Sequence, residues 1–377
     1  MRVLVNMLTS SPDRPTGISV YAWNQLRALV AHGGADYALL TNWSREYVAE
    51  QVPLDVLTFI PVASSPRSEK LAVPVGAFRV WRAARRIGAD IVFTPNPYGA
   101  LVGGRARVNV VHDLYRDTHP HLFRADRRWT WKVIFPLALA AADRIVCVSA
   151  ATQADLLRYH PSTAGRSVVV HEASSVRASA SPQSPFAGRY VLLVANAAPT
   201  KNLDALLAAL EQLEQDDEVP PVLWIGRDDS GDLGRALARR SALSKFIPVG
   251  QKSEPELATL YRHAEFLVVP SLVEGFCLPV VEAQGFGVPV VCSDISVLRE
   301  VAAKGARYFD PHDPGDIASA IREVSRDSKL RADLSAAAMN NAGRFSWERA
   351  ARELHRVFEL ALNGGPTCRG GARGRGE

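Results

Sequence analysis

The segment Val268–Glu300, VVPSLVEGFCLPVVEAQGFGVPVVCSDISVLRE, holds the clearest chemical pattern in the chain. An apolar run that ends at Pro270 predicts a buried strand. Pro279 suits the first turn of a helix, where its missing N–H costs no hydrogen bond. Backbone N–H groups at the start of such a helix, together with the helix dipole, favour an anion such as a phosphate. The residues that would present these groups are Gly275, Phe276, Cys277 and Leu278.

Two carboxylates bracket this predicted anion site. Glu274 precedes it in the loop, and Glu282 follows about one turn into the helix. A carboxylate only accepts hydrogen bonds, so it suits vicinal hydroxyls such as those of a ribose or a hexose. A phosphate site between two such carboxylates fits a sugar that is joined through a diphosphate to a nucleoside. The alternative is that both glutamates are solvated side chains of a loop and a helix face.

Cations that could meet a diphosphate follow two predicted strands. Lys201 comes shortly after the apolar run Tyr190–Val194, and a lysine just past a strand provides a point charge for a diphosphate. Its alternative is an exposed loop lysine. Asn196 lies in the same loop, and Arg227, which follows the strand Val222–Ile225, is a weaker candidate for a second cation.

The first half of the chain offers two weaker candidates. His112 ends the apolar run Val108–Val111, and ligands bind at the carboxyl ends of strands in open α/β sheets. A single histidine there is also common as a structural residue. Gly17 opens a predicted helix without a G-x-G-x-x-G pattern, so a dinucleotide fingerprint is missing and a simple turn is the alternative.

The text Glu274–Glu282, EGFCLPVVE, resembles the E-G-F-G-L-P-x-x-E signature of retaining GT-B glycosyltransferases of family four. Ala283–Val291 and the Lys-Asn ending of Tyr190–Asn202 are similar to that family as well. His112–Leu114, HDL, resembles many members, notably mannosyl-transferring ones. Cys277 departs from the usual glycine. Many relatives also carry an arginine near Asn196 or Thr200, which this chain lacks.

The resemblance implies a role for each candidate. Glu274 would hold hydroxyls of the transferred sugar, Lys201 would stabilise the departing diphosphate, and His112 would lie near the anomeric end of the sugar. These three are the implied catalytic residues. The implied donor-binding residues are Gly17, Asn196, Arg227, Val249, Gly275, Phe276, Cys277, Leu278 and Glu282, with Glu282 on the ribose and Val249 in the loop for the base.

The implied function is transfer of a mannose-like or glucose-like hexose from a nucleoside diphosphate sugar to a sugar, lipid-linked or small-molecule acceptor. The chain contains no Asp-x-Asp, which fits a metal-independent front-face mechanism with no other cofactor. One alternative is a nucleotide-sugar-binding protein without turnover. Another is a glycoside hydrolase, whose carboxylates lie about 5–9.5 Å apart. Eight residues of helix rise about 12 Å, so Glu274 and Glu282 fit that reaction poorly.

The elements that must position these residues alternate along the chain, which favours parallel sheets with crossover helices. The predicted strands are 3–5, 91–93, 108–111, 145–148, 168–170, 190–194, 222–225, 266–269 and 288–292. The predicted helices are 19–32, 76–87, 203–213, 254–264, 316–326 and a single amphipathic helix over 341–362. The fold class is α/β, and the resemblance implies GT-B, with two Rossmann-like domains and a cleft between them.

We predict an acceptor-side domain over 1–172, a linker over 173–188, and a donor-binding domain over 189–343. A helix over 344–362 would cross back to the first domain, and 363–377 would be a disordered tail. The length of 377 residues favours two domains. Four scattered cysteines indicate neither a disulfide framework nor a zinc site.

The chain is basic, with a formal net charge of +5, but only seven of its cations are lysines. The arginine excess reflects composition, so we expect no nucleic-acid partner. We expect no signal peptide and a cytoplasmic protein, because the most apolar stretch, 133–142, is too short to span a bilayer.

Two basic segments also carry aromatic residues, and such faces can rest on anionic membranes. The first has Arg79, Arg82, Arg85 and Arg86 beside Phe78 and Trp81. The second has Arg124, Arg127, Arg128 and Lys132 beside Trp129 and Trp131. Peripheral contact with the inner face of a membrane is one interpretation, and solvated helix faces are the other.

Overall fold

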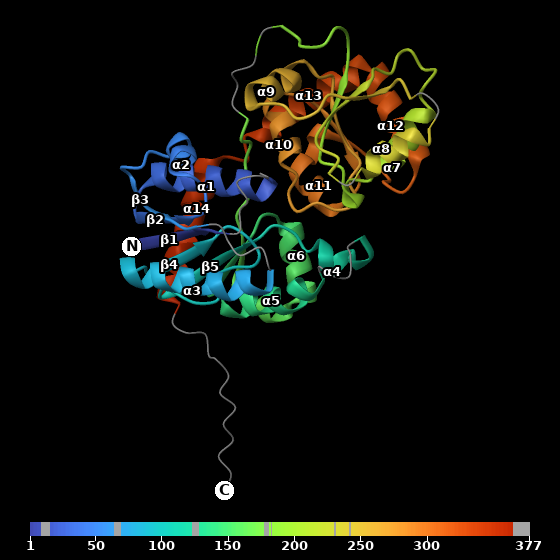
Figure 1. Ribbon diagram of the computed structural model, residues 1–377. Helices are drawn as coiled ribbons and strands as arrows, with labels where there is room; N and C mark the ends of the chain where they lie inside the picture. Colours follow the sequence, from blue (N-terminus) through green and yellow to red (C-terminus); the bar gives the residue numbers. More distant parts are fainter. Residues whose placement is uncertain are drawn as a thin grey trace.

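The computed structural model describes residues 1–8, 16–63, 69–122, 128–176, 181, 183–229, 231–240 and 243–364, and the side chains of 69–73, 128–130 and 232 lie outside that description. The chain forms two parallel β-sheets, one in each half of the sequence, with helices on their faces (Figure 1). The predicted α/β fold with two Rossmann-like domains is therefore confirmed.

The first domain holds seven parallel strands in the order β3-β2-β1-β4-β5-β6-β7. Their bounds are β1 Arg2–Met7, β2 Asp36–Thr41, β3 Leu57–Pro61, β4 Ile91–Thr94, β5 Ala106–Val111, β6 Arg144–Cys147 and β7 Ser167–Val169. The connecting helices are α1 Gly17–His32, α2 Arg45–Gln51, α3 Glu69–Ile87, α4 Tyr115–Thr118, α5 Arg128–Ala141 and α6 Ala150–Tyr159. The strand order reverses direction between β1 and β4.

The second domain holds six parallel strands in the order β10-β9-β8-β11-β12-β13. Their bounds are β8 Val191–Val194, β9 Val222–Ile225, β10 Phe246–Pro248, β11 Leu267–Val269, β12 Val290–Ser293 and β13 Ala306–Phe309. Its helices are α7 Leu203–Glu211, α8 Asp232–Ala238, α9 Glu254–His263, α10 Leu278–Gly285, α11 Ser296–Ala302, α12 Pro314–Arg326 and α13 Ser328–Ala342. Here the strand order reverses between β8 and β11, and such a reversal is where open α/β sheets bind ligands.

All nine predicted strands are present, and the structure adds β2, β3, β10 and β13. These four escape the sequence patterns for a physical reason. β3 (LTFIP) and β10 (FIP) contain proline, while β2 (DYALLT) and β13 (ARYF) mix strand formers with alanine and charged residues. Pairing with a neighbouring strand, rather than local preference, decides their conformation.

The last helix corrects one prediction. A single helix over 341–362 is wrong, because α13 ends at Ala342 and α14 spans Trp347–Asn363. Ser346 caps the new helix by accepting a hydrogen bond from the Arg349 N–H. Helix α14 packs on α1 and β5 of the first domain, as its place beside α1 in Figure 1 shows. The predicted crossing back is thus made by α14, which ends at Asn363, the first residue of the predicted tail 363–377. Residues 365–377 of that tail lie outside the described residues.

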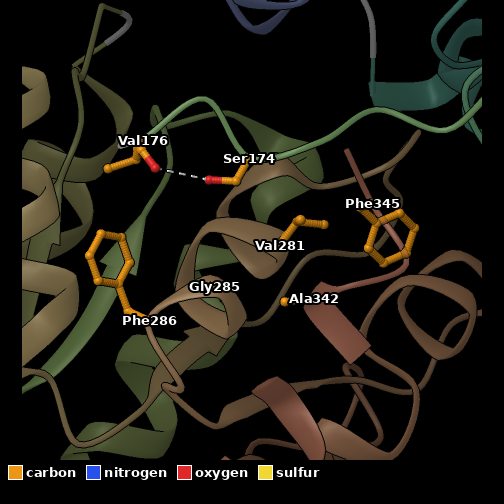
Figure 2. Close-up of a pocket in the computed structure, with 7 residues that line it drawn as sticks. All are labelled: Ser174, Val176, Val281, Gly285, Phe286, Ala342 and Phe345. Carbon is orange, nitrogen blue, oxygen red and sulfur yellow. Dashed lines mark hydrogen bonds between the residues drawn. The ribbon is translucent and has the colours of Figure 1, made fainter. Parts of the chain in front are cut away.

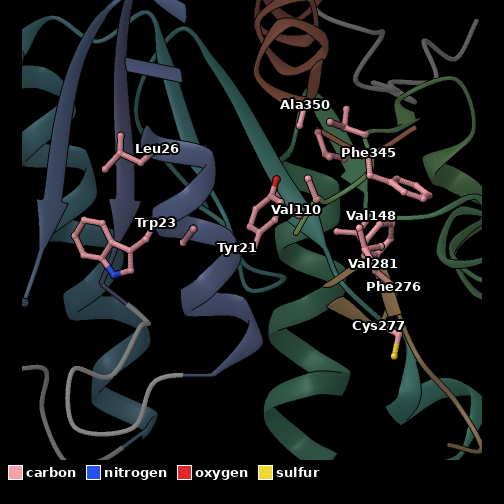
Figure 3. Close-up of a cluster of buried hydrophobic side chains, with 14 of the residues drawn as sticks. Tyr21, Trp23, Leu26, Val110, Val148, Phe276, Cys277, Val281, Phe345 and Ala350 are labelled. Atoms are coloured by element: carbon pink, nitrogen blue, oxygen red, sulfur yellow. The ribbon is translucent and has the colours of Figure 1, made fainter. Parts of the chain in front are cut away.

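One apolar cluster runs through both domains. It joins α1 and the first sheet to Phe276, Cys277 and Val281 of the second domain (Figure 3). Phe345, between α13 and α14, packs edge-on against the Phe276 ring at a centroid distance of 5.4 Å. The two domains therefore meet through a packed apolar contact as well as polar ones.

Two further sequence expectations concern the whole chain. Cys147, Cys277 and Cys292 are free and buried, and the fourth cysteine lies outside the described residues. Within the described ranges, no helix combines the length and the apolar character needed to cross a membrane.

Candidate active site

Lys201 and Glu274 meet at the reversal point of the second sheet. Lys201 ends a short 3-10 turn, Pro199–Lys201, that follows β8, and Glu274 lies in the loop after β11. The two loops are joined because the Leu272 N–H donates to the Thr200 carbonyl at 2.9 Å. The Lys201 ammonium lies 2.5 Å from the Glu274 carboxylate. The structure thus brings two of the three predicted catalytic residues into direct contact.

The Glu274 carboxylate is enclosed by donors. Its side chain is 6% exposed, the Ser271 hydroxyl donates to it at 2.7 Å, and the Tyr115 hydroxyl of the first domain approaches at 3.5 Å. Burial alone would lower the pKa of Lys201, but the adjacent Glu274 carboxylate outweighs it and leaves that pKa raised. Lys201 therefore remains an ammonium ion, which is the form that neutralises phosphate oxygens.

Gly275 lies at one of the close contacts between the two domains. A Cβ atom there would lie 1.8 Å from the His112 carbonyl oxygen, so only glycine fits. The Gly275 carbonyl accepts from the hydroxyls of Ser149 at 2.7 Å and Thr152 at 3.1 Å. These contacts place the loop that carries Glu274 directly against the end of β5.

His112 is held on both sides of its ring. Its Nδ1 lies 3.1 Å from the Glu172 carboxylate, and its Nε2 lies 3.1 Å from the Pro95 carbonyl. The Tyr21 ring packs edge-on against it at 4.8 Å, and burial, with a smaller effect of Glu172, raises the pKa of the Tyr21 phenol well above its ordinary value. With 7% of its surface exposed, His112 contributes its backbone to the Gly275 contact while Glu172 fixes its ring.

The start of α10 explains an unusual residue. Cys277 is the N-cap and adopts φ 77°, in the left-handed region that favours glycine. The family signature has glycine at this place, so the backbone requirement persists although the side chain differs. Burial raises the pKa of the Cys277 thiol well above its ordinary value, and Glu274 adds to the effect. Phe276 packs into the interface core, and Leu278 lies partly buried at the first helical position.

Glu282 lies on α10 and is nearly covered. The hydroxyls of Ser175 and Tyr261 each donate to one carboxylate oxygen at 3.0 Å. Burial raises the pKa of Glu282, and the two hydrogen bonds only partly oppose this. Since Ser175 belongs to the linker between the domains, the predicted ribose-binding carboxylate is in contact with the interdomain connection.

A small hollow is lined in part by Val281, the residue that precedes Glu282 on α10 (Figure 2). It has a volume of about 200 Å³, and its lining comes from the linker, α10 and the segment before α14. The lining residues are Ser174, Val176, Val281, Gly285, Phe286, Ala342 and Phe345. Both chain segments that connect the domains therefore meet at this hollow.

Asn196 and Arg227 are joined at the ends of β8 and β9. The Asn196 side-chain oxygen accepts from the Arg227 N–H at 3.1 Å. The Arg227 guanidinium lies 3.8 Å from the Asp229 carboxylate, a long ion pair. Asn196 thus orients the backbone that carries Arg227.

Val249 and Gly17 occupy the flanks. The Val249 N–H donates to the Trp224 carbonyl at 3.0 Å, which extends the β10 pairing. Gly17 is the first residue of α1, and a Cβ atom there would meet no atom of the described residues within 4 Å. The backbone at Gly17 is therefore open to close approach.

Glu300 makes an interdomain contact that no sequence pattern indicated. From α11 of the second domain, its carboxylate accepts from the N–H groups of Ala150 at 2.8 Å and Ala151 at 3.0 Å, at the start of α6. His171 Nε2 lies 2.7 Å from the same carboxylate. Burial raises the pKa of Glu300, but the bonds from His171 and the two N–H groups outweigh it and leave that pKa lowered. Glu172 and Tyr115 were also missed, because each acts across a long sequence separation.

Family comparisons match both halves of the chain. Residues 178–341 match the model described as glycosyl transferases group 1, and residues 15–173 match the model described as glycosyltransferase family 4. The O-antigen chain mannosyltransferase B of Escherichia coli is 29% identical over 67% of this chain and 70% of its own length. A D-inositol 3-phosphate glycosyltransferase of Corynebacterium aurimucosum is 24% identical over 96% of this chain and 97% of its own length. For the corresponding protein of Corynebacterium kroppenstedtii, at 31% identity, the match spans 44% of its length.

Solved structures share the whole arrangement. Sucrose-phosphate synthase from Thermosynechococcus elongatus matches with a TM-score of 0.76 at 19% identity, over 96% of this chain and 98% of that one. Alr3699/HepE from Anabaena, in complex with UDP-glucose, matches with a TM-score of 0.75 at 17% identity, over 95% and 99%. WaaG, a glycosyltransferase involved in lipopolysaccharide biosynthesis, matches with a TM-score of 0.72 at 15% identity, over 94% of this chain and 99% of that one. The expected GT-B fold is confirmed by these likenesses.

Proposed function

The chain belongs to the group 1 glycosyltransferases of family 4, and on that premise we propose that it transfers a hexose from a nucleoside diphosphate sugar to an acceptor hydroxyl, with retention of configuration and without a metal ion. The observation that carries the proposal is the Lys201–Glu274 pair at the sheet reversal point, held against the backbone of His112. One cation for phosphate and one acceptor for sugar hydroxyls stand side by side there.

Lys201 acts on the leaving group. As the bond between the anomeric carbon and the phosphate oxygen breaks, negative charge accumulates on the diphosphate. An ammonium already in place stabilises that charge without reorganisation, in a site largely closed to water. The raised pKa of Lys201 keeps this charge available throughout the neutral range.

Glu274 and Glu282 orient the donor. Glu274 accepts hydrogen bonds from hydroxyls of the transferred hexose on the side opposite Lys201. Glu282 accepts from the ribose hydroxyls, which take the place that the Ser175 hydroxyl now occupies. Both carboxylates are largely buried and already accept hydrogen bonds from protein hydroxyls. A ligand that displaces those donors must supply hydroxyls of its own, because a buried acceptor left without a donor is costly.

The chemical step is a front-face exchange. The bond from the anomeric carbon to the phosphate oxygen breaks, and the bond to the acceptor oxygen forms on the same face of the ring. The acceptor hydroxyl proton passes to the departing phosphate oxygen. Glu172 keeps the His112 ring in place beside Tyr21, so the first domain offers a fixed surface to the acceptor.

The donor sugar is mannose-like or glucose-like. The sequence His112–Leu114, HDL, resembles mannosyl-transferring members of the family, which favours mannose carried by GDP. One structural neighbour, matched over nearly its whole length, is described in complex with UDP-glucose. The acceptor is a sugar, a lipid-linked sugar or a small molecule. A panel of UDP-, GDP-, ADP- and dTDP-sugars, tested for slow donor hydrolysis and for transfer, identifies the donor, and NMR of the product gives its anomeric configuration.

The test of the site uses three variants on the donor so identified. We expect Lys201→Ala to lower turnover by about 100- to 1000-fold, the loss typical of one removed charge-stabilising donor. Lys304→Ala removes an exposed lysine of the same domain and should leave turnover unchanged. Glu282→Ala should weaken nucleotide binding, and EDTA should have no effect.

Three results would contradict the proposal. Normal turnover by Lys201→Ala would remove the leaving-group role. Nucleotide binding with neither transfer nor donor hydrolysis would indicate a binding protein. Cleavage of a simple glycoside without any nucleotide would indicate a hydrolase.

A further inference from the structure

We propose that the outer face of α3 and α5 in the first domain is a docking surface for an anionic lipid membrane. This face, which we call the α3–α5 face, is defined by Phe78 and Trp81 of α3, Val102 of the following loop, and Val133 and Leu137 of α5. It lies on the side of the sheet opposite α1 and α14 and plays no part in the site described above.

The sheet geometry makes the two helices neighbours. Helix α3 packs on residues of β1, β2 and β4, including Leu4 and Val92. Helix α5 packs on residues of β5 and β6, including Val111 and Ile145. Strands β4 and β5 pair directly, so the helices cover adjacent parts of one sheet face. The alternate residues of these strands face α1 and α14 instead.

The α3–α5 face exposes large apolar side chains. Phe78 is 57% exposed, Trp81 41% and Leu137 51%, and five of the ten large hydrophobic residues exposed in the described chain lie on this face. The Phe78 and Trp81 rings are neighbours at 5.8 Å. A Cβ atom on Gly103 would lie 3.6 Å from the Trp81 Cα, which brings the loop with Val102 onto α3. Clustering of this kind marks an interaction surface rather than scattered exposure.

The charge around these side chains has one sign. Arg79, Arg82, Arg85 and Arg86 follow one another on α3, and no acidic residue occurs between Pro74 and Ile87. Helix α5 contains no acidic residue, and its Lys132 is exposed beside Val133. The Arg85 guanidinium lies 5.7 Å from the centre of the Trp81 ring. Between Pro74 and Ile87 of α3, and along α5, this face therefore offers cations with no carboxylate of the same segment to neutralise them.

Aromatic rings among arginines match the boundary of an anionic bilayer. Tryptophan and phenylalanine enter the headgroup region, while arginine side chains reach the lipid phosphates. Each cation near an anionic surface strengthens binding by roughly fivefold. The second basic segment predicted from the sequence adds only Lys132 and Trp131 here, because residues 123–127 and the side chains of Arg128 and Trp129 lie outside the described residues. Trp131 is buried and donates to Asp117, so it supports the fold and not the surface.

Vesicle co-sedimentation tests the proposal with the full chain. We expect binding to vesicles of phosphatidylcholine and phosphatidylglycerol mixed 7:3, about tenfold weaker binding to phosphatidylcholine alone, and weaker binding as salt rises. The double variant Phe78→Ser/Trp81→Ser should bind the mixed vesicles at least tenfold more weakly, because two exposed rings no longer enter the lipid. Charge reversal by Arg82→Glu/Arg86→Glu should have a similar effect.

A matched control removes equal apolar exposure elsewhere. Met339 on α13 and Leu360 on α14 are 58% and 51% exposed, and Met339→Ser/Leu360→Ser should bind vesicles like the wild type. Donor hydrolysis in solution should be the same in all variants, which separates this test from that of the proposed function. Equal binding by the ring variant and the control would overturn the proposal, as would equal binding to both vesicle types.

Two other occupants are outcomes of the same experiment. Displacement of the protein from vesicles by a single-stranded oligonucleotide, with binding lost in the ring variant, would assign the face to nucleic acid. A lipid-independent dimer that Phe78→Ser/Trp81→Ser dissociates, seen in sedimentation velocity, would assign it to a second copy of the chain. Either result would overturn the membrane assignment.

Discussion

The contacts of the Glu300 carboxylate with α6 and His171, which we call the Glu300 clasp, hold the two domains together. We predict that the single substitution Glu300→Gln on α11 shifts the protein toward an open arrangement of the domains. In the closed arrangement its carboxylate receives two backbone N–H groups of α6 and the imidazole of His171. In Glu300→Gln the amide oxygen can still accept from one N–H, but the amide NH₂ faces the other. The change therefore removes one charge-assisted hydrogen bond and weakens a second.

The magnitude follows from these bonds. A hydrogen bond to a charged group contributes a net of about 1.5–3 kcal/mol, against about 1 kcal/mol for a neutral one. We expect closure to lose about 2–3 kcal/mol, which is roughly a 30- to 150-fold shift from closed toward open molecules. The individual domains should keep their stability, because the carboxylate is simply hydrated once the domains part.

Small-angle X-ray scattering and kinetics measure the effect together. Glu300→Gln should increase the radius of gyration of the donor-free protein and lower kcat for transfer, while nucleotide affinity, which depends on the second domain, stays unchanged. Glu323→Gln breaks an exposed ion pair with Arg307 within one domain and serves as the control. A Glu300→Gln protein with the wild-type radius and the wild-type kcat would refute the clasp.

The clasp also has a pH signature. The pKa of Glu300 is lower in the closed form than in the open form, so the closed form binds fewer protons. Its contribution is fully present above the ordinary glutamate pKa of about 4.3 and is lost as the pH falls through the lowered value. Wild-type protein should therefore expand below about pH 4, and Glu300→Gln should lack this step.

Three further predictions concern the site. Gly275→Ala should lower the rate of transfer by at least about 100-fold and leave nucleotide affinity unchanged, because the new Cβ would collide with the His112 carbonyl. Assays of transfer and of nucleotide binding check this, and a normal rate of transfer would contradict the close approach. Cys277→Gly should change the free energy of unfolding by less than about 1 kcal/mol, whereas Cys277→Val should lower it by about 2 kcal/mol, because a β-branched residue is strained at positive φ. Urea titration measures both free energies, and equal losses in the two variants would contradict the strain. Glu172→Ala should cost about 1–3 kcal/mol of unfolding free energy by leaving His112 Nδ1 without its partner, and Glu172→Gln should recover most of it; failure of glutamine to do so would assign the effect to charge instead.

The sequence predicted the parts of this protein whose signals are local. Buried strands appear as β-branched runs, and the segment from Glu274 to Glu282 carries phosphate, sugar and helix-start signals within nine residues. Gly343 and Ser346 mark the break between α13 and α14. Because the residues around them are mostly helix formers, the composition predicted one continuous helix. Helix periodicity reports a preference for helix but not the exact residue where one helix stops.

The missed site residues share a different property. Glu172 reaches His112 across 60 positions, and Glu300 reaches Ala150 across 150. Each looks like an ordinary charged residue at the end of a strand or on a short helix. Pairing of β5, β6 and β7 in one sheet brings Glu172 to His112, and the contact of α11 with α6 across the domains brings Glu300 to Ala150. No spacing rule within one segment could have found these partners.

The position of α14 also has a consequence for how the protein is made. The face of the first sheet that carries Phe93 is covered by Phe358 of α14, whose ring lies 5.4 Å away. About 190 residues separate the end of β7 from the end of α14. At about 5–20 residues per second, the ribosome needs roughly 10–40 s to supply that cover, and until then an apolar face of the earlier domain is open to chaperones or to aggregation. A circular permutant in which α14 precedes β1 would remove this delay.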